Sequence, residues 1–344
     1  MCSYDFHGLT LSIAAEADVQ AALRARLGRF PAGRLAGAPH LHFEFLPAAG
    51  ATPRRLERPA GPGRTIMDLT AGAVEYFEAS QQLYVDLAGR GQARCDIQAR
   101  RVEIACPAAD PERVWICAHL LFTIPLAELL KREGLYMVHA AGVADAGQGL
   151  LIAGESGAGK TTLAIALLRA GFGFMSDDTL LLARAAPSPQ AGHGAETRGV
   201  SPAVRVLAFP DELDLTDQTV GFFPELQRDA AGTPSGRRPK RPACVTRVYG
   251  VQPQWECAPA MLVFPQTAAA PTSVLVPMPP AEALLQLLSN VVRTEVHSSQ
   301  AHLDALAGLV QQCRCFRLQA GRDFDTLPAR LQAILHHTGA PECP

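Results

Sequence analysis

The stretch Gly154–Thr162, GESGAGKTT, constrains the fold more than any other part of this sequence. It follows an apolar run, LLIA, and precedes LAIALLRAGF, which has the composition of a buried helix. A strand, a glycine-rich loop and a helix in that order bring backbone N–H groups and the positive end of a helix together. The sequence therefore predicts an α/β fold with a phosphate-binding loop and a helix over 160–170.

The loop satisfies the Walker A pattern GxxxxGK[ST], which is specific. The composition of this chain predicts on the order of 0.002 chance matches to it. In this pattern Lys160 reaches the terminal phosphates of a nucleotide and the Thr161 hydroxyl ligates Mg²⁺. The competing interpretation is a glycine turn that happens to include Lys-Thr. We expect ATP and Mg²⁺ as cofactors, bound by Gly154, Glu155, Ser156, Gly157, Ala158, Gly159, Lys160, Thr161 and Thr162.

A β-hairpin is predicted to lead into the loop. Apolar residues over 135–144 and 149–153 indicate two strands, and DAGQG between them indicates a tight turn. A link of about four residues is too short for a helical crossover, so these strands must pair antiparallel. Ordinary doubly wound nucleotide-binding domains use parallel neighbours here. The sequence therefore predicts a mixed sheet.

Two acids and a histidine are candidates for chemistry at the loop. Asp177 and Asp178 follow Lys160 by 17 and 18 residues and precede an apolar run. Carboxylates near a phosphate loop hold Mg²⁺ or accept a proton, while the alternative is a solvated turn before a strand. His139 lies in the strand before the loop, as a packed core residue or as a neighbour of the metal and γ-phosphate.

The chain is long enough for two domains. Residues 1–125 are predicted to form an N-terminal α+β region, mostly β, for recognition or assembly, and 126–344 to form the catalytic domain. The N-terminal region should contain a helix over 16–28 and strands over 41–46, 73–79, 82–87 and 100–106.

Further elements are predicted after the loop helix. Strands are expected in FMSDDTLLLA, VRVLAF, ACVTRVYGV, AMLVFP and CFRLQ, and helices near 280–292, 299–312 and 326–337. The segment 232–242, GTPSGRRPKRP, is a basic loop. It is either a solvated loop or a lid or docking patch for an acidic or phosphate-rich substrate.

Composition excludes several classes of protein. A net charge of -2 argues against binding to nucleic acid. Nine cysteines without a disulfide spacing indicate reduced thiols and a cytoplasmic location. We expect no signal peptide and no membrane span, and we interpret VWICAHLLFTIPLAELL as a buried helix. Cys313 and Cys315 could share a strand face, but they lack the partners of a metal site.

Together, the hairpin, GESGAGKTT and the acidic pair resemble the HPr kinase/phosphorylase family, whose catalytic domain is related to phosphoenolpyruvate carboxykinases. The matching residues are His139, the loop Gly154–Thr161 and the pair Asp177–Asp178. ETRGV at 196–200 resembles part of the family's ExRG signature, which carries over Glu196 and Arg198. The sequence around His139 and around the acidic pair is most similar to that of diverged serine kinases. The genes of those kinases occur beside genes for natural-product peptides, including lasso-peptide precursors.

The resemblance implies a P-loop serine kinase that transfers the γ-phosphoryl group of ATP to a hydroxyl of a peptide or protein. Catalytic roles then fall to Lys160, His139, Arg198 and Asp178, which accepts the hydroxyl proton. Thr161, Asp177, Asp178 and Glu196 are the candidate metal ligands. Which aspartate is base and which is ligand stays open, as does phosphorolysis. The resemblance suggests a homo-oligomer. The alternatives are a nucleotide-gated regulatory protein and a small-molecule alcohol kinase.

Overall fold

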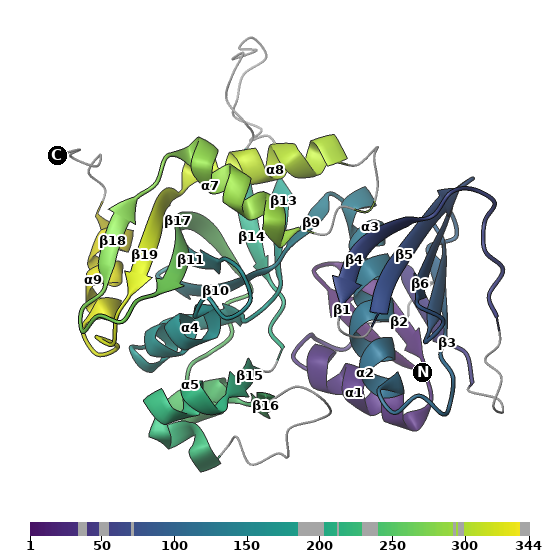
Figure 1. Ribbon diagram of the computed structural model, residues 1–344, viewed down its shortest axis with the longest axis horizontal. Coiled ribbons are helices and arrows are strands. Elements are labelled where there is room, and N and C mark those ends of the chain that lie inside the picture. The colour runs from purple at the N-terminus through teal and green to yellow at the C-terminus, as the bar shows by residue number, and fades with distance from the viewer. Residues whose placement is uncertain are drawn as a thin grey trace, which may run out of the picture. The chain divides into compact units, whose positions relative to one another are not determined.

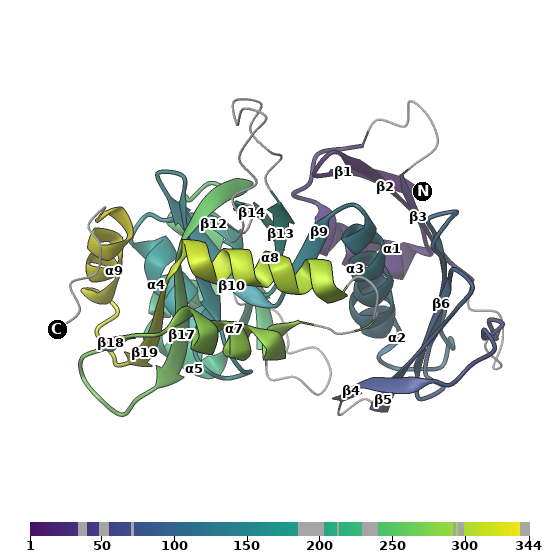
Figure 2. The ribbon, with the colours of Figure 1, turned by 90° about the horizontal axis from the view of Figure 1, so that it is seen from above.

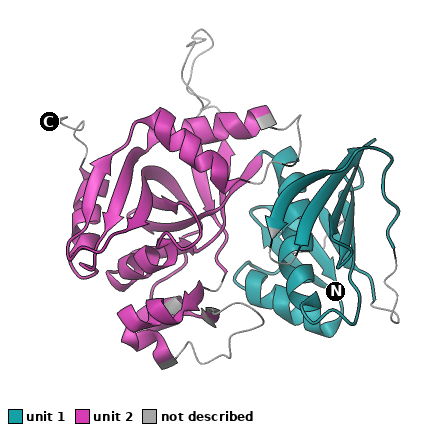
Figure 3. Cartoon of the chain, in the orientation of Figure 1, with its two compact units in different colours: residues 1–134, 292–299 teal, residues 135–291, 300–344 magenta. Residues whose placement is uncertain are grey.

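The computed structural model describes residues 1–33, 40–47, 55–69, 72–184, 203–211, 213–228, 240–291, 294 and 299–337. The chain divides into two compact units (Figure 3). Unit 1 contains Met1–Gly134 and Val292–Ser299, and unit 2 contains Leu135–Val291 and Gln300–Pro344. Each unit has its own sheet and its own core.

Unit 1 is built on one eight-stranded sheet in the order β1-β2-β3-β8-β7-β6-β5-β4 (Figure 1). The pairs β2/β3 and β3/β8 are parallel and the others are antiparallel. Four strands confirm predictions, and four were not predicted. The strands are β1 (Cys2–Phe6), β2 (Leu9–Ala14), β3 (Leu41–Phe45), β4 (Arg64–Leu69), β5 (Gly72–Ala79), β6 (Gln82–Leu87), β7 (Gln92–Asp96) and β8 (Arg101–Ala105).

The helices of unit 1 lie inside the curve of this sheet (Figure 2). They are α1 (Ala17–Leu27), α2 (Arg113–Trp115), the π-helical turn η1 (Ile116–Leu121) and α3 (Phe122–Arg132). The π-helical turn η1 ends at Leu121. Pro125 of α3 lacks an N–H and so cannot donate a hydrogen bond to the carbonyl of Leu121. Arg113–Arg132 is long and apolar enough to cross a membrane, but 72% of its most apolar window is buried inside the protein. The buried helix predicted here is confirmed.

Buried polar groups also occur in unit 1. In α3, the Lys131 ammonium donates to Glu128 Oε1 at 2.7 Å and to Thr294 Oγ1 at 2.8 Å, and all three residues are buried. Glu128 also forms an ion pair with Arg132 at 3.7 Å, whereas loss of Glu128 would leave the Lys131 charge buried beside a hydroxyl alone.

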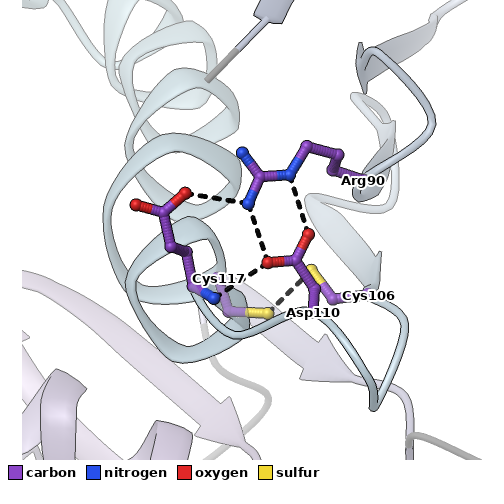
Figure 4. Close-up of polar contacts among 5 residues, drawn as sticks. Arg90, Cys106, Asp110 and Cys117 are labelled. Carbon is purple, nitrogen blue, oxygen red and sulfur yellow. Dashed lines mark hydrogen bonds and ion pairs between the residues drawn. The ribbon is translucent and has the colours of Figure 1, made fainter. Parts of the chain in front are cut away.

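A charged cluster fastens the link between β8 and α2 (Figure 4). Arg90 makes two 2.8 Å hydrogen bonds to the Asp110 carboxylate and a third to Glu112.

Beside this cluster, the buried thiols of Cys106 and Cys117 lie 2.9 Å apart. The contact with Cys117 and burial raise the pKa of Cys106 well above its usual value. Among the described cysteines none forms a disulfide.

Unit 2 is a mixed α/β unit with a nine-stranded mixed sheet (Figure 1). The main path is β12-β10-β11-β17-β14-β13-β9, and β19 pairs with both β17 and β18. The strands are β9 (Leu135–Val138), β10 (Ala140–Asp145), β11 (Gln148–Ala153), β12 (Gly173–Ser176), β13 (Leu180–Arg184), β14 (Val204–Ala208), β17 (Glu256–Thr267), β18 (Val274–Pro277) and β19 (Arg314–Ala320).

The hairpin that leads into the glycine-rich loop is confirmed. β10 and β11 pair antiparallel, and Asp145 is opposite Gln148 across a two-residue turn. Ala146 and Gly147 have φ values of 47° and 79°, the left-handed conformation that favours such hairpins. The other neighbour of β11 is β17, which is parallel. The strand before the loop therefore has one antiparallel and one parallel neighbour.

Two layers of helices cover the sheet of unit 2, as both ribbon views show (Figures 1 and 2). One core joins the sheet to α4 (Lys160–Arg169) and α9 (Leu327–His336). The core on the opposite face joins it to α7 (Pro280–Leu287) and α8 (Ser299–Gln312). All four helices were predicted, although the helix expected over 280–292 ends in the 3₁₀ turn η3 (Leu288–Asn290).

A small subassembly lies beside α4. It comprises β15 (Leu213–Thr216), α5 (Asp217–Phe222), the 3₁₀ turn η2 (Pro224–Arg228), β16 (Lys240–Ala243) and α6 (Val245–Tyr249). The strand predicted in ACVTRVYGV is wrong, because most of that segment is the helix α6. Gly250 ends α6 in a left-handed conformation, and Val248 and Tyr249 pack on the core around α4. Tertiary packing thus overrides the β propensity of these residues.

Candidate active site

The candidate site forms where two stretches of strand are each interrupted, so that the pairing of the chain changes from β9 with β13 to β10 with β12. The strand predicted over 135–144 is interrupted at His139, and the strand predicted from FMSDDTLLLA is interrupted over 177–179. On one side of these breaks Val138 is opposite Leu180, and on the other side Gly142 is opposite Ser176. The two breaks therefore face each other, and they bring His139 opposite the acidic pair.

Asp178 and His139 meet across this junction. The Nε2 atom of His139 is 3.9 Å from Asp178 Oδ1, and about half of each side chain is exposed, at 49% and 47%. A packed core role for His139, one of the two alternatives, is therefore excluded. An exposed carboxylate next to an imidazole is accessible to a substrate hydroxyl and can accept a proton from it.

Asp177 points to a different partner. It is only 2% exposed, and its Oδ2 accepts a 3.1 Å hydrogen bond from the Thr161 hydroxyl. Thr161 lies in the first turn of α4, directly after the loop. Successive acids thus have separate environments, one buried against the loop helix and one half exposed beside His139.

The loop itself depends on its glycines. Gly154, Gly157 and Gly159 have φ values of 145°, 83° and 98°, which other residues rarely adopt. The Lys160 amine lies over the loop, donating to the carbonyls of Gly154 at 2.8 Å and Glu155 at 3.1 Å. Lys160 is only 7% exposed. Its charge is therefore already positioned at the loop.

The donor set fits Mg²⁺ only with further ligands from a nucleotide. Across the described part of the chain, no three His, Cys, Asp or Glu residues cluster as a metal site would require. Mg²⁺ is commonly held by one or two carboxylates together with phosphate oxygens and water. Asp177 and the Thr161 hydroxyl, 3.1 Å apart at the loop, match that kind of site.

Two neighbours of the loop were missed by the sequence analysis. The Asn290 side chain accepts a hydrogen bond from the N–H of Gly154, at 3.3 Å. The Thr219 hydroxyl lies 3.3 Å from that of Thr162, and Thr219 belongs to α5. Neither residue stands in a recognisable motif, and both are distant from the loop in sequence.

The structure does not describe every predicted residue. Glu196 and Arg198 lie outside the described residues, as do Arg237 and Arg238 of the basic segment. Two described arginines form ion pairs with acids, Arg205 with Glu256 at 2.6 Å and Arg241 with Asp217 at 3.1 Å.

Comparison with known proteins identifies one set of sequence relatives. HPr kinase/phosphorylases from Bordetella pertussis, Bordetella parapertussis and Bordetella bronchiseptica are each 45% identical to this chain over 56 residues. The match covers 16% of this chain and 18% of each relative, so the chain spans less than a fifth of the relatives it matches.

No protein-family model matches the chain. Among solved structures, the Hpr(Ser) kinase/phosphatase from Coxiella burnetii aligns with 58% of this chain and 93% of its own, at 13% identity and a TM-score of 0.26. Part of this chain, 56 residues, is therefore similar in sequence to HPr kinase/phosphorylases.

Proposed function

We propose that the protein is an ATP-dependent kinase that transfers the γ-phosphoryl group to a hydroxyl, with a serine of a peptide or protein as the acceptor. One observation carries the proposal. Asp177 is a buried carboxylate that accepts a hydrogen bond from the helix after the loop. The next residue, Asp178, is a half-exposed carboxylate beside His139. Phosphoryl transfer needs these two environments, one for a metal and one for a proton.

The residues then have distinct roles. Backbone N–H groups of the loop and the Lys160 ammonium hold the β- and γ-phosphates. Thr161 and Asp177 would hold Mg²⁺, which when bound offsets the charge of the phosphates. The acceptor oxygen forms a bond to the γ-phosphorus as the bond to the β-phosphate oxygen breaks, and ADP leaves. Asp178 accepts the proton of the hydroxyl, with His139 beside it to stabilise the carboxylate.

Several finer assignments belong to this proposal. Residues 126–344 are proposed as a catalytic domain with a P-loop and a phosphoenolpyruvate carboxykinase-like core, and 1–125 as a recognition or assembly region. Glu196 is proposed as a further metal ligand and Arg198 as a cation for the transferred group. A cytoplasmic location and a homo-oligomer are also proposed, by analogy with the family.

Isothermal titration with ATP and Mg²⁺ tests the nucleotide site. The wild-type chain should bind, and Lys160→Met should lose most of the affinity, because the methionine keeps the length of the side chain and removes its charge. Equal affinity of both proteins, or no binding by the wild type, would refute the site.

Incubation with γ-labelled ATP, Mg²⁺ and candidate serine peptides tests transfer. Label on a serine, located by mass spectrometry and absent with Asp178→Asn, is the expected result. Binding of ATP without transfer to any hydroxyl compound would instead identify a nucleotide-gated regulatory protein. Transfer to a small alcohol alone would identify a small-molecule kinase.

A further inference from the structure

We propose that Asn290 is a positioning residue that holds the phosphate loop in place relative to His139, an inference that rests on the proposed kinase function. Asn290 is the last residue of η3, on the segment that follows α7. It is far from the loop in sequence and is 5% exposed. Its two oxygens contact the two loops of the candidate site.

The side-chain oxygen contacts the beginning of the phosphate loop. Asn290 Oδ1 accepts the N–H of Gly154 at 3.3 Å, directly after β11 ends at Ala153. The carbonyl of the same glycine accepts the Lys160 ammonium at 2.8 Å. Both polar groups of Gly154 are therefore held, one by Asn290 and the other by the lysine that must bind nucleotide.

The backbone oxygen contacts the other loop. The carbonyl of Asn290 accepts the N–H of His139 at 2.7 Å, at the point where β9 gives way to β10. One residue thus fixes the position of the phosphate loop relative to the histidine beside Asp178. A substitution of the side chain removes the first contact and leaves the second intact.

The orientation of the amide is set by its other partners. Asn290 Nδ2 donates to the carbonyl of Gln286 at 3.0 Å and to Ser289 Oγ at 3.3 Å, both on the preceding turns. Because Gly154 presents an N–H, the atom that faces it must be an acceptor, and both requirements give the same orientation. The side chain is therefore held in place before any ligand arrives.

The contact gains importance when ATP binds. Lys160 must then exchange the carbonyls of Gly154 and Glu155 for phosphate oxygens, so its support of the loop is lost. The bond from Gly154 to Asn290 involves neither the lysine nor the phosphates. It can persist and keep the left-handed Gly154 in the conformation that the loop requires.

Three variants test the inference. Asn290→Leu has a similar volume and no acceptor. Asn290→Asp keeps an oxygen that can accept the N–H of Gly154 and removes the amide donor. Ser289→Ala is the matched control, because it removes a neighbour of the amide without touching Gly154.

The readouts are the Kd for Mg·ATP, the Tm, and hydrogen exchange of the peptide that contains Gly154. Asn290→Leu should weaken Mg·ATP binding about 10-fold and speed exchange at the loop, whereas Ser289→Ala should stay within about twofold of wild type. Asn290→Asp, which keeps the acceptor, should leave exchange at the loop closer to wild type than Asn290→Leu does.

Equal effects of Asn290→Leu and Ser289→Ala would overturn the inference, as would unchanged affinity in Asn290→Leu or loop exchange in Asn290→Asp as fast as in Asn290→Leu. Failure of the wild type to bind Mg·ATP would instead remove the proposed function. In that case exchange at the loop still decides whether Asn290 holds Gly154, because that measurement needs no nucleotide.

Discussion

The hydroxyl of Thr161 offers the sharpest test of the metal site. Thr161→Val keeps the shape of the side chain and deletes the 3.1 Å hydrogen bond to Asp177. A hydrogen bond to a charged group contributes about 1.5–3 kcal/mol, and Asp177 is almost fully buried. We therefore expect the free energy of unfolding to fall by about 1.5–3 kcal/mol in the absence of nucleotide.

The effect on binding should depend on the metal. With Mg²⁺ the variant loses a ligand as well, and we expect ATP to bind about 10- to 100-fold more weakly, since each 1.4 kcal/mol is a factor of about ten. With EDTA in place of Mg²⁺ the two proteins should bind ATP with nearly equal affinity. Titration calorimetry under both conditions measures the difference.

The next residue supplies the control. Thr162→Val removes a hydroxyl that faces Thr219 and not a carboxylate, so any effect on ATP affinity should be the same with Mg²⁺ and with EDTA. If Thr161→Val weakens ATP binding equally in EDTA, or if Thr162→Val matches it, then Thr161 is not a metal ligand and the assignment of Asp177 loses its support.

Three other outcomes follow from the structure. Asp178→Asn should keep ATP affinity within a few-fold and abolish transfer, measured with labelled ATP; full turnover would exclude Asp178 as base. Asp110→Asn should lower unfolding free energy by about 1–2 kcal/mol at neutral pH, because Arg90 holds the pKa of Asp110 below its usual value. That contribution is lost as pH falls through the folded-state pKa, so urea titrations of both proteins should converge below about pH 4. Gly159→Ala should destabilise the fold by about 1 kcal/mol through its left-handed backbone, whereas Gly221→Ala in α5 should not; equal Tm values would contradict this.

The features predicted correctly are those with a local cause. The helix after the loop and the hairpin before it follow from glycine placement and a short turn, and both occur as predicted. The segment 243–251 was misassigned because its β-branched residues favour a strand, whereas contacts of Val248 and Tyr249 with a distant core stabilise a helix. Local composition carried no information about that core.

The junction at the candidate site was not predictable in the same way. His139 and Asp178 were singled out separately, but their meeting depends on the registers β9/β13 and β10/β12, which are long-range pairings. Asn290 was missed for the same reason. It lies 136 positions from Gly154, and an asparagine after an apolar helix has no specific sequence signal.

The unusual lysine content has a practical consequence for chemical labelling. Two of the three lysines, Lys131 and Lys160, are each 7% exposed, one within an ion pair and one over the glycine-rich loop. Reagents that acylate amines attack the neutral, accessible form, so both should react slowly in the folded chain. The amino terminus and Lys240 are the remaining amines. Amine-directed crosslinkers should therefore report few contacts around these two buried lysines.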